Sequence, residues 1–221
     1  MPKGAHVNVQ NDTFILSKRG WLLSAVIGSL FLFFTMTGLH LFQFLTGALL
    51  LAVLAIFRNP ERTSTEHENG AILSSVDGVV LSIEEAVVDD QKMTKMTVMN
   101  SLWDVSMLRA PFDGIVEGFK IRHGASLPLY NPLSEALNEK AVLSFRTHKG
   151  EEIYIEHVSE QSCFPIGITM EKGDRYKEGS RYGFLAKGRS VFYFPEGVRL
   201  AVGAGATLRA GESLMGYFPA A

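Results

Sequence analysis

The sequence is poor in the residues that mark several common classes of protein. Its 221 residues include one cysteine, Cys163, so no disulfide can form within the chain. Neither Cys163 nor the six histidines fall in CxxC, HExxH or HxH spacings, so no metal site is predicted. A thiol nucleophile built on Cys163 and His157 lacks an orienting third group, and a buried structural cysteine is favoured. The net charge is only −2, and this lack of a basic excess argues against a nucleic-acid partner.

Charge is also absent from one long stretch, Trp21 to Phe57. A single helix of that length would measure about 55 Å, against a hydrocarbon core of about 30 Å. Gly38 and the polar residues around it interrupt the run, so two helices are predicted, at about 21–36 and 40–57. Basic residues flank both ends of the run: Lys18, Arg19, Arg58 and Arg62. The positive-inside rule then places both ends on the cytoplasmic side.

The run is too long for a cleaved signal peptide and lacks a small-residue cleavage pattern. A buried helical hairpin in a soluble core remains an alternative. The favoured interpretation is a cytoplasmic N-terminal segment at 1–20, a transmembrane hairpin at 21–57 and a linker at 58–70. The remaining residues, 71–221, would then lie on the cytoplasmic side of the cell membrane.

Residues 71–221 carry short runs of β-branched and aromatic residues bounded by Gly, Asp or Pro, which predict strands. Asp77-Gly78 and Asp113-Gly114 lie between apolar runs and predict hairpin turns. Only "PLSEALNEKA" favours a short helix. The predicted fold class is mainly β: a two-helix transmembrane hairpin followed by an all-β sandwich or barrel domain.

Five motifs follow one another in a familiar order: "FRNPER", "SSVDG", "MNSLWDVSMLRAPFDGIVEG", "LNEKAVLSF" and the C-terminal "EKGDRYKEGSRYGFLAKG…VGAGATLRAGESLMG". Together they resemble the short, membrane-anchored phosphatidylserine decarboxylases, a family of pyruvoyl-dependent carboxy-lyases. The resemblance runs from about Gly20 to the C-terminus.

The resemblance implies a self-processing proenzyme (zymogen) of phospholipid biosynthesis. A serine of a Gly-Ser pair attacks the preceding carbonyl carbon, the chain is cut, and the serine becomes a pyruvoyl group. That group serves as electron sink while phosphatidylserine loses carbon dioxide and becomes phosphatidylethanolamine. The implied partners are phosphatidylserine and the membrane, with homo-oligomers also expected.

The family's catalytic residues are only partly present in this sequence. Asp77 in "SSVDG" stands at the family's catalytic aspartate, although spacing alone favours a plain Asp-Gly turn at this position. Ser106 stands where the family has histidine, and a hydroxyl cannot replace imidazole as a base near pH 7. The family's Gly-Ser-Arg-Val appears here as Gly188–Val191 with serine and arginine exchanged. Ser190 is then the predicted pyruvoyl precursor, with cleavage between Arg189 and Ser190 and with Asp77 assisting.

A one-residue shift on a strand turns a side chain to the opposite face unless a bulge compensates. His123 or His157 can replace the missing base only if folding brings one of them close to Ser190. Two hypotheses stay open: an active decarboxylase using Ser190, and an uncleaved relative that binds lipid or a partner. Without a preceding glycine and an evident base, we expect most of the chain to remain uncut.

Overall fold

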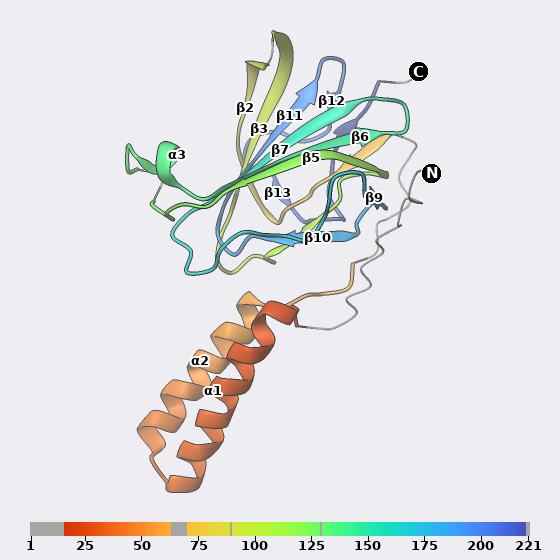
Figure 1. The fold of residues 1–221 in the computed structure, drawn as a ribbon. Coiled ribbons are helices and arrows are strands. Elements are labelled where there is room, and N and C mark those ends of the chain that lie inside the picture. Colours follow the sequence, from red (N-terminus) through yellow and green to blue (C-terminus); the bar gives the residue numbers. More distant parts are fainter. Residues whose placement is uncertain (1–15, 63–69, 89, 129, 220–221) are drawn as a thin grey trace. The chain divides into compact units, whose positions relative to one another are not determined.

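The computed structural model describes residues 16–62, 70–88, 90–128 and 130–219 (Figure 1). They fall into two compact units, a helical one that ends at Glu61 and a β-rich one that begins at Arg62. Residues 63–69 of the expected linker, and residues 1–15 of the expected N-terminal segment, lie outside the described residues.

The helical unit is an antiparallel pair, α1 (Lys18–Thr37) and α2 (His40–Ile56). Gly38 ends α1 in the left-handed conformation at φ 70°, where glycine meets no steric penalty. The helices pack through aromatic rings such as Phe34 and Phe42, whose centroids are 5.3 Å apart. The two helices and their glycine turn confirm the predicted pair at about 21–36 and 40–57.

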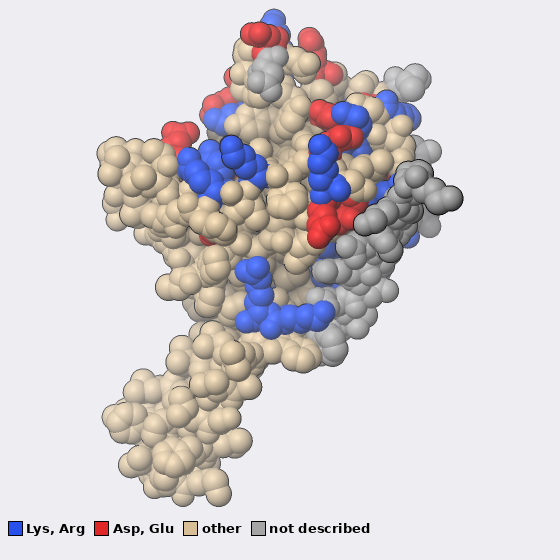
Figure 2. Space-filling model, in the orientation of Figure 1, with Lys and Arg blue, Asp and Glu red and all other residues tan. Residues whose placement is uncertain are grey.

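α1 is, among the described residues, the one helix long and apolar enough to cross a membrane by length and composition. α2 is a shorter apolar helix of 17 residues. Many large apolar side chains of the pair face outward, including Leu22, Met36 and Phe44. In Figure 2 the lower part of the helical pair shows no blue or red atoms on the visible face.

The second unit is built almost entirely from strands. They are β1 (Ala71–Leu73), β2 (Gly78–Val88), β3 (Gln91–Asn100), β4 (Met107–Arg109), β5 (Gly114–Arg122), β6 (Lys140–Thr147), β7 (Glu152–Ser159), β8 (Gly167–Ile168), β9 (Arg175–Tyr176), β10 (Arg181–Phe184), β11 (Gly188–Pro195), β12 (Arg199–Leu200), β13 (Thr207–Leu208) and β14 (Leu214–Tyr217). One short helix, α3 (Ser134–Leu137), lies within the predicted "PLSEALNEKA" segment.

The strands form three antiparallel sheets. The large sheet has the order β13-β2-β3-β11-β7-β6-β5-β9, and β1-β14-β12 and β4-β10-β8 form two small ones. The large sheet curls into a half-barrel (Figure 1). Its concave side encloses a core of large buried side chains, among them Phe145, Tyr182, Phe192 and Phe194. The predicted mainly-β fold class is confirmed.

Both predicted hairpin turns are wrong. Asp77-Gly78 connects β1 to β2, but β1 pairs with β14 and β2 pairs with β3. Asp113-Gly114 connects β4 to β5, which also belong to different sheets. An Asp-Gly pair favours a tight turn, but tertiary pairing decides whether the strands on either side meet. One hairpin, β2–β3, turns instead at Asp90, whose φ is 62°.

Candidate active site on β11

β11 places Ser190 on the inner face of the half-barrel. Successive strand residues alternate between faces, so Ser190, Phe192 and Phe194 point into the core together. The Ser190 side chain is completely buried. β11 pairs with β3 and with β7 in unbroken register from Gly188 onward. No bulge therefore offsets the one-residue shift on this strand.

Folding brings His157 of β7 directly opposite Ser190 in the ladder. The Ser190 Oγ lies 2.7 Å from His157 Nδ1, and His157 Nε2 lies 2.7 Å from the Tyr182 hydroxyl of β10. All three side chains are fully buried. The imidazole that the sequence could not locate near Ser190 is thus His157, one of the two histidines left open.

Burial keeps this network uncharged. It lowers the pKa of His157 from its ordinary value to about 3, because an imidazolium without counter-charge is costly away from water. Burial likewise raises the pKa of Tyr182, so the phenol keeps its proton. At neutral pH the imidazole therefore has one protonated and one free nitrogen, and the free nitrogen can accept the proton of a hydroxyl.

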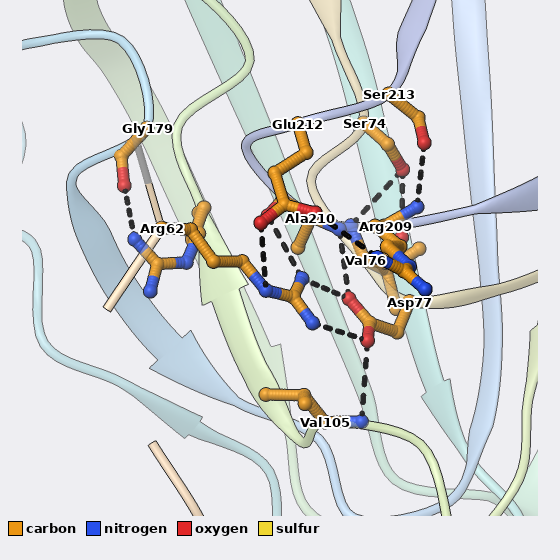
Figure 3. Close-up of polar contacts among 11 residues, drawn as sticks. Arg62, Ser74, Val76, Asp77, Val105, Gly179, Arg209, Ala210, Glu212 and Ser213 are labelled. Carbon is orange, nitrogen blue, oxygen red and sulfur yellow. Dashed lines mark hydrogen bonds and ion pairs between the residues drawn. The ribbon is translucent and has the colours of Figure 1, made fainter. Parts of the chain in front are cut away.

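Asp77 lies in a separate cluster of hydrogen-bonded polar groups (Figure 3). Arg62 donates two hydrogen bonds to its carboxylate, one of them 2.7 Å long, and the backbone N–H of Ala210 donates another at 2.7 Å. The N–H of Val105 lies 3.4 Å away. Burial alone would lower the pKa of Arg62, but the hydrogen bonds and charge of Asp77 raise it above its ordinary value.

Asp77 and Ser190 are therefore not brought together. The partners of the Asp77 carboxylate within the described chain are Arg62, Val105 and Ala210, and neither Ser190 nor His157 is among them. This arrangement ties the start of β2 to the segments before β4 and after β13.

Arg189, which stands directly after Gly188 where the family has its serine, occupies the opposite face of β11. Its side chain is about one-fifth exposed, and its Nε lies 3.3 Å from Glu160 Oε1. Burial raises the pKa of Glu160, while the charges of Arg189 and Lys187 oppose that shift. Ser190, one residue further along the strand, therefore lies on the core face.

Sequence reasoning left His157 open beside His123 and missed Tyr182 as a member of the site. A usable signal for His157 was the alternation in "EIYIEHV", which places it on the same face as the buried Ile153 and Ile155. No comparable signal marks Tyr182, because its strand is only four residues long. Cys163, expected to be buried, is exposed.

Comparison with known proteins agrees with the motifs. The family model described as phosphatidylserine decarboxylase matches residues 49–216. A phosphatidylserine decarboxylase proenzyme of Geobacter metallireducens is 32% identical over 177 residues, covering 78% of this chain and 80% of the relative. The proenzyme of Ruegeria pomeroyi is 31% identical over 166 residues, covering 72% of this chain and 75% of the relative. The proenzyme of Burkholderia mallei is 26% identical over 208 residues, covering 93% of this chain and 96% of the relative. The chain therefore belongs to the phosphatidylserine decarboxylase family.

Proposed function

We propose that this chain is a membrane-anchored phosphatidylserine decarboxylase proenzyme that cuts itself between Arg189 and Ser190. The observation that carries the proposal is the 2.7 Å contact between Ser190 Oγ and His157 Nδ1. This contact supports a role for His157 as the general base, because Ser106 stands where the family has its histidine.

In the proposed processing, His157 Nδ1 accepts the hydroxyl proton as Ser190 Oγ attacks the Arg189 carbonyl carbon. The proton then passes to the Ser190 nitrogen as the C–N bond breaks, which leaves an ester. Loss of the Ser190 α-proton breaks the Cβ–O bond and frees the Arg189 carboxylate. Water then replaces the nitrogen, which leaves as ammonia.

The residues fit the formation of a pyruvoyl group at position 190, because its precursor hydroxyl lies within hydrogen-bonding distance of an imidazole nitrogen. Once formed, the group would supply an electrophilic carbonyl for the amine of phosphatidylserine and an electron sink for decarboxylation. His157, on the neighbouring strand, would remain beside it. Asp77, predicted to assist Ser190, is proposed to act indirectly, by holding the segments around β2 and β4 in place.

The proposed substrate also explains the helical pair. Phosphatidylserine resides in membranes, and α1 and α2 would anchor the β unit at that surface on the cytoplasmic side. Basic residues at the start of α1, such as Arg19, and after α2, such as Arg58, support this orientation. Homo-oligomerisation stays a prediction.

A second candidate function is that of an uncleaved relative that binds phospholipid without decarboxylating it. The observation in its favour is the setting of Ser190, fully buried between two continuous ladders. The low pKa of His157, about 3, also makes it a weak base. Self-processing happens only once in the life of a chain, however, so a slow reaction suffices.

Intact-mass spectrometry of the denatured full chain, purified in detergent, tests the proposal. In place of the mostly uncut chain expected from the sequence, the contact with His157 leads us to expect loss of the 24.3 kDa species and a C-terminal fragment that begins at position 190 with a borohydride-reducible pyruvoyl mass. Ser190→Ala should abolish cleavage, and His157→Gln should slow it by roughly 10²–10⁴-fold, the usual contribution of a general base. Ser144→Ala is the matched control, because Ser144 lies on β6 outside the network.

The result that overturns the proposal is a wild-type chain that stays at full mass with an unmodified Ser190. Binding of that uncut chain to phosphatidylserine vesicles, and not to phosphatidylcholine vesicles, would then establish the second candidate.

A further inference from the structure

The connection between β5 and β6, which contains α3, projects from the half-barrel (Figure 1). From Gly124 to Ser134 its sequence has no charged residue. Three of its large side chains face away from the protein: Tyr130 is 85% exposed, Leu133 56% and Leu137 49%. These three residues form the apolar tip. Apolar side chains gathered on an exposed projection mark a contact with a partner or a membrane.

A network of hydrogen bonds fixes the base of this projection. The side chain of Asn138 accepts a hydrogen bond from the Leu127 N–H at 2.7 Å and donates one to the Leu127 carbonyl at 2.8 Å. The Ala125 N–H donates to the Leu137 carbonyl at 2.8 Å, and a Cβ at Gly124 would lie only 2.2 Å from that oxygen. The apolar tip therefore cannot fold back onto the core unless these bonds break.

Basic side chains lie beside the projection. Lys120 and Arg122 are exposed near the end of β5, and Arg122 donates hydrogen bonds to the carbonyls of Glu135 and Asn138 at 3.2 and 3.0 Å. Where Figure 1 places α3, the surface in Figure 2 is mostly tan with blue atoms beside it. Apolar side chains, a tyrosine and a basic margin are together typical of segments that lie in the headgroup region of a bilayer.

The covalent link between the two units also favours a bilayer over a partner from solution. α2 ends at Ile56 and β1 begins at Ala71, and an extended chain between them spans at most about 50 Å. If the helical pair is anchored, the bilayer is always available to the β unit at a high effective concentration. A soluble partner would have no such advantage.

We propose that the apolar tip inserts into the headgroup region of the bilayer that holds α1 and α2, with Lys120 and Arg122 next to anionic headgroups. This inference rests on the proposed membrane anchor, but not on self-cleavage or decarboxylation. The second contact would limit the motion of the β unit about residues 57–70 and hold it at the surface where its proposed substrate lies.

Quenching of tryptophan fluorescence by brominated phospholipids tests the contact in the full-length chain, reconstituted in nanodiscs. Trp21→Phe and Trp103→Phe remove the two native tryptophans, and Leu133→Trp then places a single probe on the apolar tip. Val87→Trp in the same background is the matched control, because Val87 is 70% exposed on the β2–β3 hairpin. We expect several-fold stronger quenching of the Leu133→Trp chain. Equal quenching of the two chains would overturn the proposal.

The native Trp21 separates failure of this contact from failure of the anchor. It lies on α1, so in a chain carrying only Trp103→Phe it should be quenched whenever α1 is in the bilayer. Quenching of Trp21 without quenching of Leu133→Trp would overturn the second contact alone. Absence of both would overturn the anchor as well. A Leu133→Trp probe shielded from both the lipid quencher and aqueous iodide would show a protein contact, such as a second copy of the chain, and would also overturn the proposal.

Lipid charge gives a second readout. Quenching of Leu133→Trp should be stronger in nanodiscs that contain phosphatidylglycerol than in phosphatidylcholine alone, and high salt should reduce the difference. Lys120→Glu should reduce it too. Equal quenching in the two lipids would overturn the role of the basic side chains. Tyr130→Trp repeats every measurement at a second, more exposed position, so the test does not depend on one substitution.

Discussion

Two buried polar clusters of this protein handle charge in opposite ways. The Arg62–Asp77 pair is ionic, with side chains only 7% and 10% exposed, and the arginine and two backbone N–H groups surround its carboxylate. The Ser190–His157–Tyr182 network is neutral, and its hydrogen bonds within the described part of the chain join only uncharged side chains. Burying neutral groups in a core costs less free energy than burying charged ones. The neutral network nevertheless makes the stability of the fold sensitive to acid, because His157 gains a proton when the chain unfolds at low pH.

His157 should destabilise the fold at low pH. Its pKa falls from about 6.5 in the unfolded chain to about 3 in the folded one, so the unfolded state binds more protons below pH 6.5. The stability it contributes is complete above pH 6.5 and is lost as pH falls toward 3, at up to about 1.4 kcal/mol per pH unit.

Denaturant midpoints measured at pH 7.5 and 5 for Ser190→Ala and for His157→Leu/Ser190→Ala chains check this prediction. The single variant should lose about 2 kcal/mol more than the double variant over this range. Equal losses in the two chains would show that His157 does not hold a depressed pKa.

At the scale of the element, β11 is the central strand on which the site depends. Gly188 begins it at a very close approach to β7: a Cβ at this position would lie 2.0 Å from the Val158 carbonyl oxygen. The main chains of β7 and β11 meet there without room for a side chain, which keeps Ser190 and His157 in register.

Gly188→Ala should therefore destabilise the chain by about 1–3 kcal/mol or more, because backbone, not a flexible side chain, has to move. Gly118→Ala on β5 is the matched control, since its Cβ would lie 3.7 Å from Ser144 Oγ, an ordinary contact. Denaturant midpoints of both variants measure the difference. A Gly188→Ala chain as stable as Gly118→Ala would mean that the two strands are not packed this closely.

At the scale of the whole molecule, the proposed membrane topology of the helical pair would determine which side of the membrane the β unit faces. Basic residues at the start of α1 and after α2 predict that both ends of the pair stay inside the cell. The turn at Gly38–Leu39 would then face outward.

Cysteine labelling of intact cells tests this topology. Because Cys163 is exposed, all variants carry Cys163→Ser. Ala5→Cys and Glu66→Cys should resist a membrane-impermeant thiol reagent, whereas Leu39→Cys should react with it. External labelling of either of the first two positions would rule out the hairpin with a cytoplasmic β unit.

Local patterns were enough to locate most elements. An uncharged run with a glycine in the middle predicts two helices, and short apolar alternations predict strands, because both signals arise from neighbours along the chain. The Asp77-Gly78 hairpin failed for the complementary reason: strand pairing is a long-range property, and β1 finds its partner in β14 near the other end of the chain.

The candidate site shows the same contrast between local sequence signals and long-range contacts. The order of the motifs was sufficient to identify the family and to single out Asp77 and Ser190 as candidates. Only the tertiary structure separates them, placing Asp77 with Arg62 and Ser190 with His157, 33 residues apart in sequence. Strand register, fixed by packing of the core face, decides which side chains meet across a sheet, and no spacing along the chain encodes it.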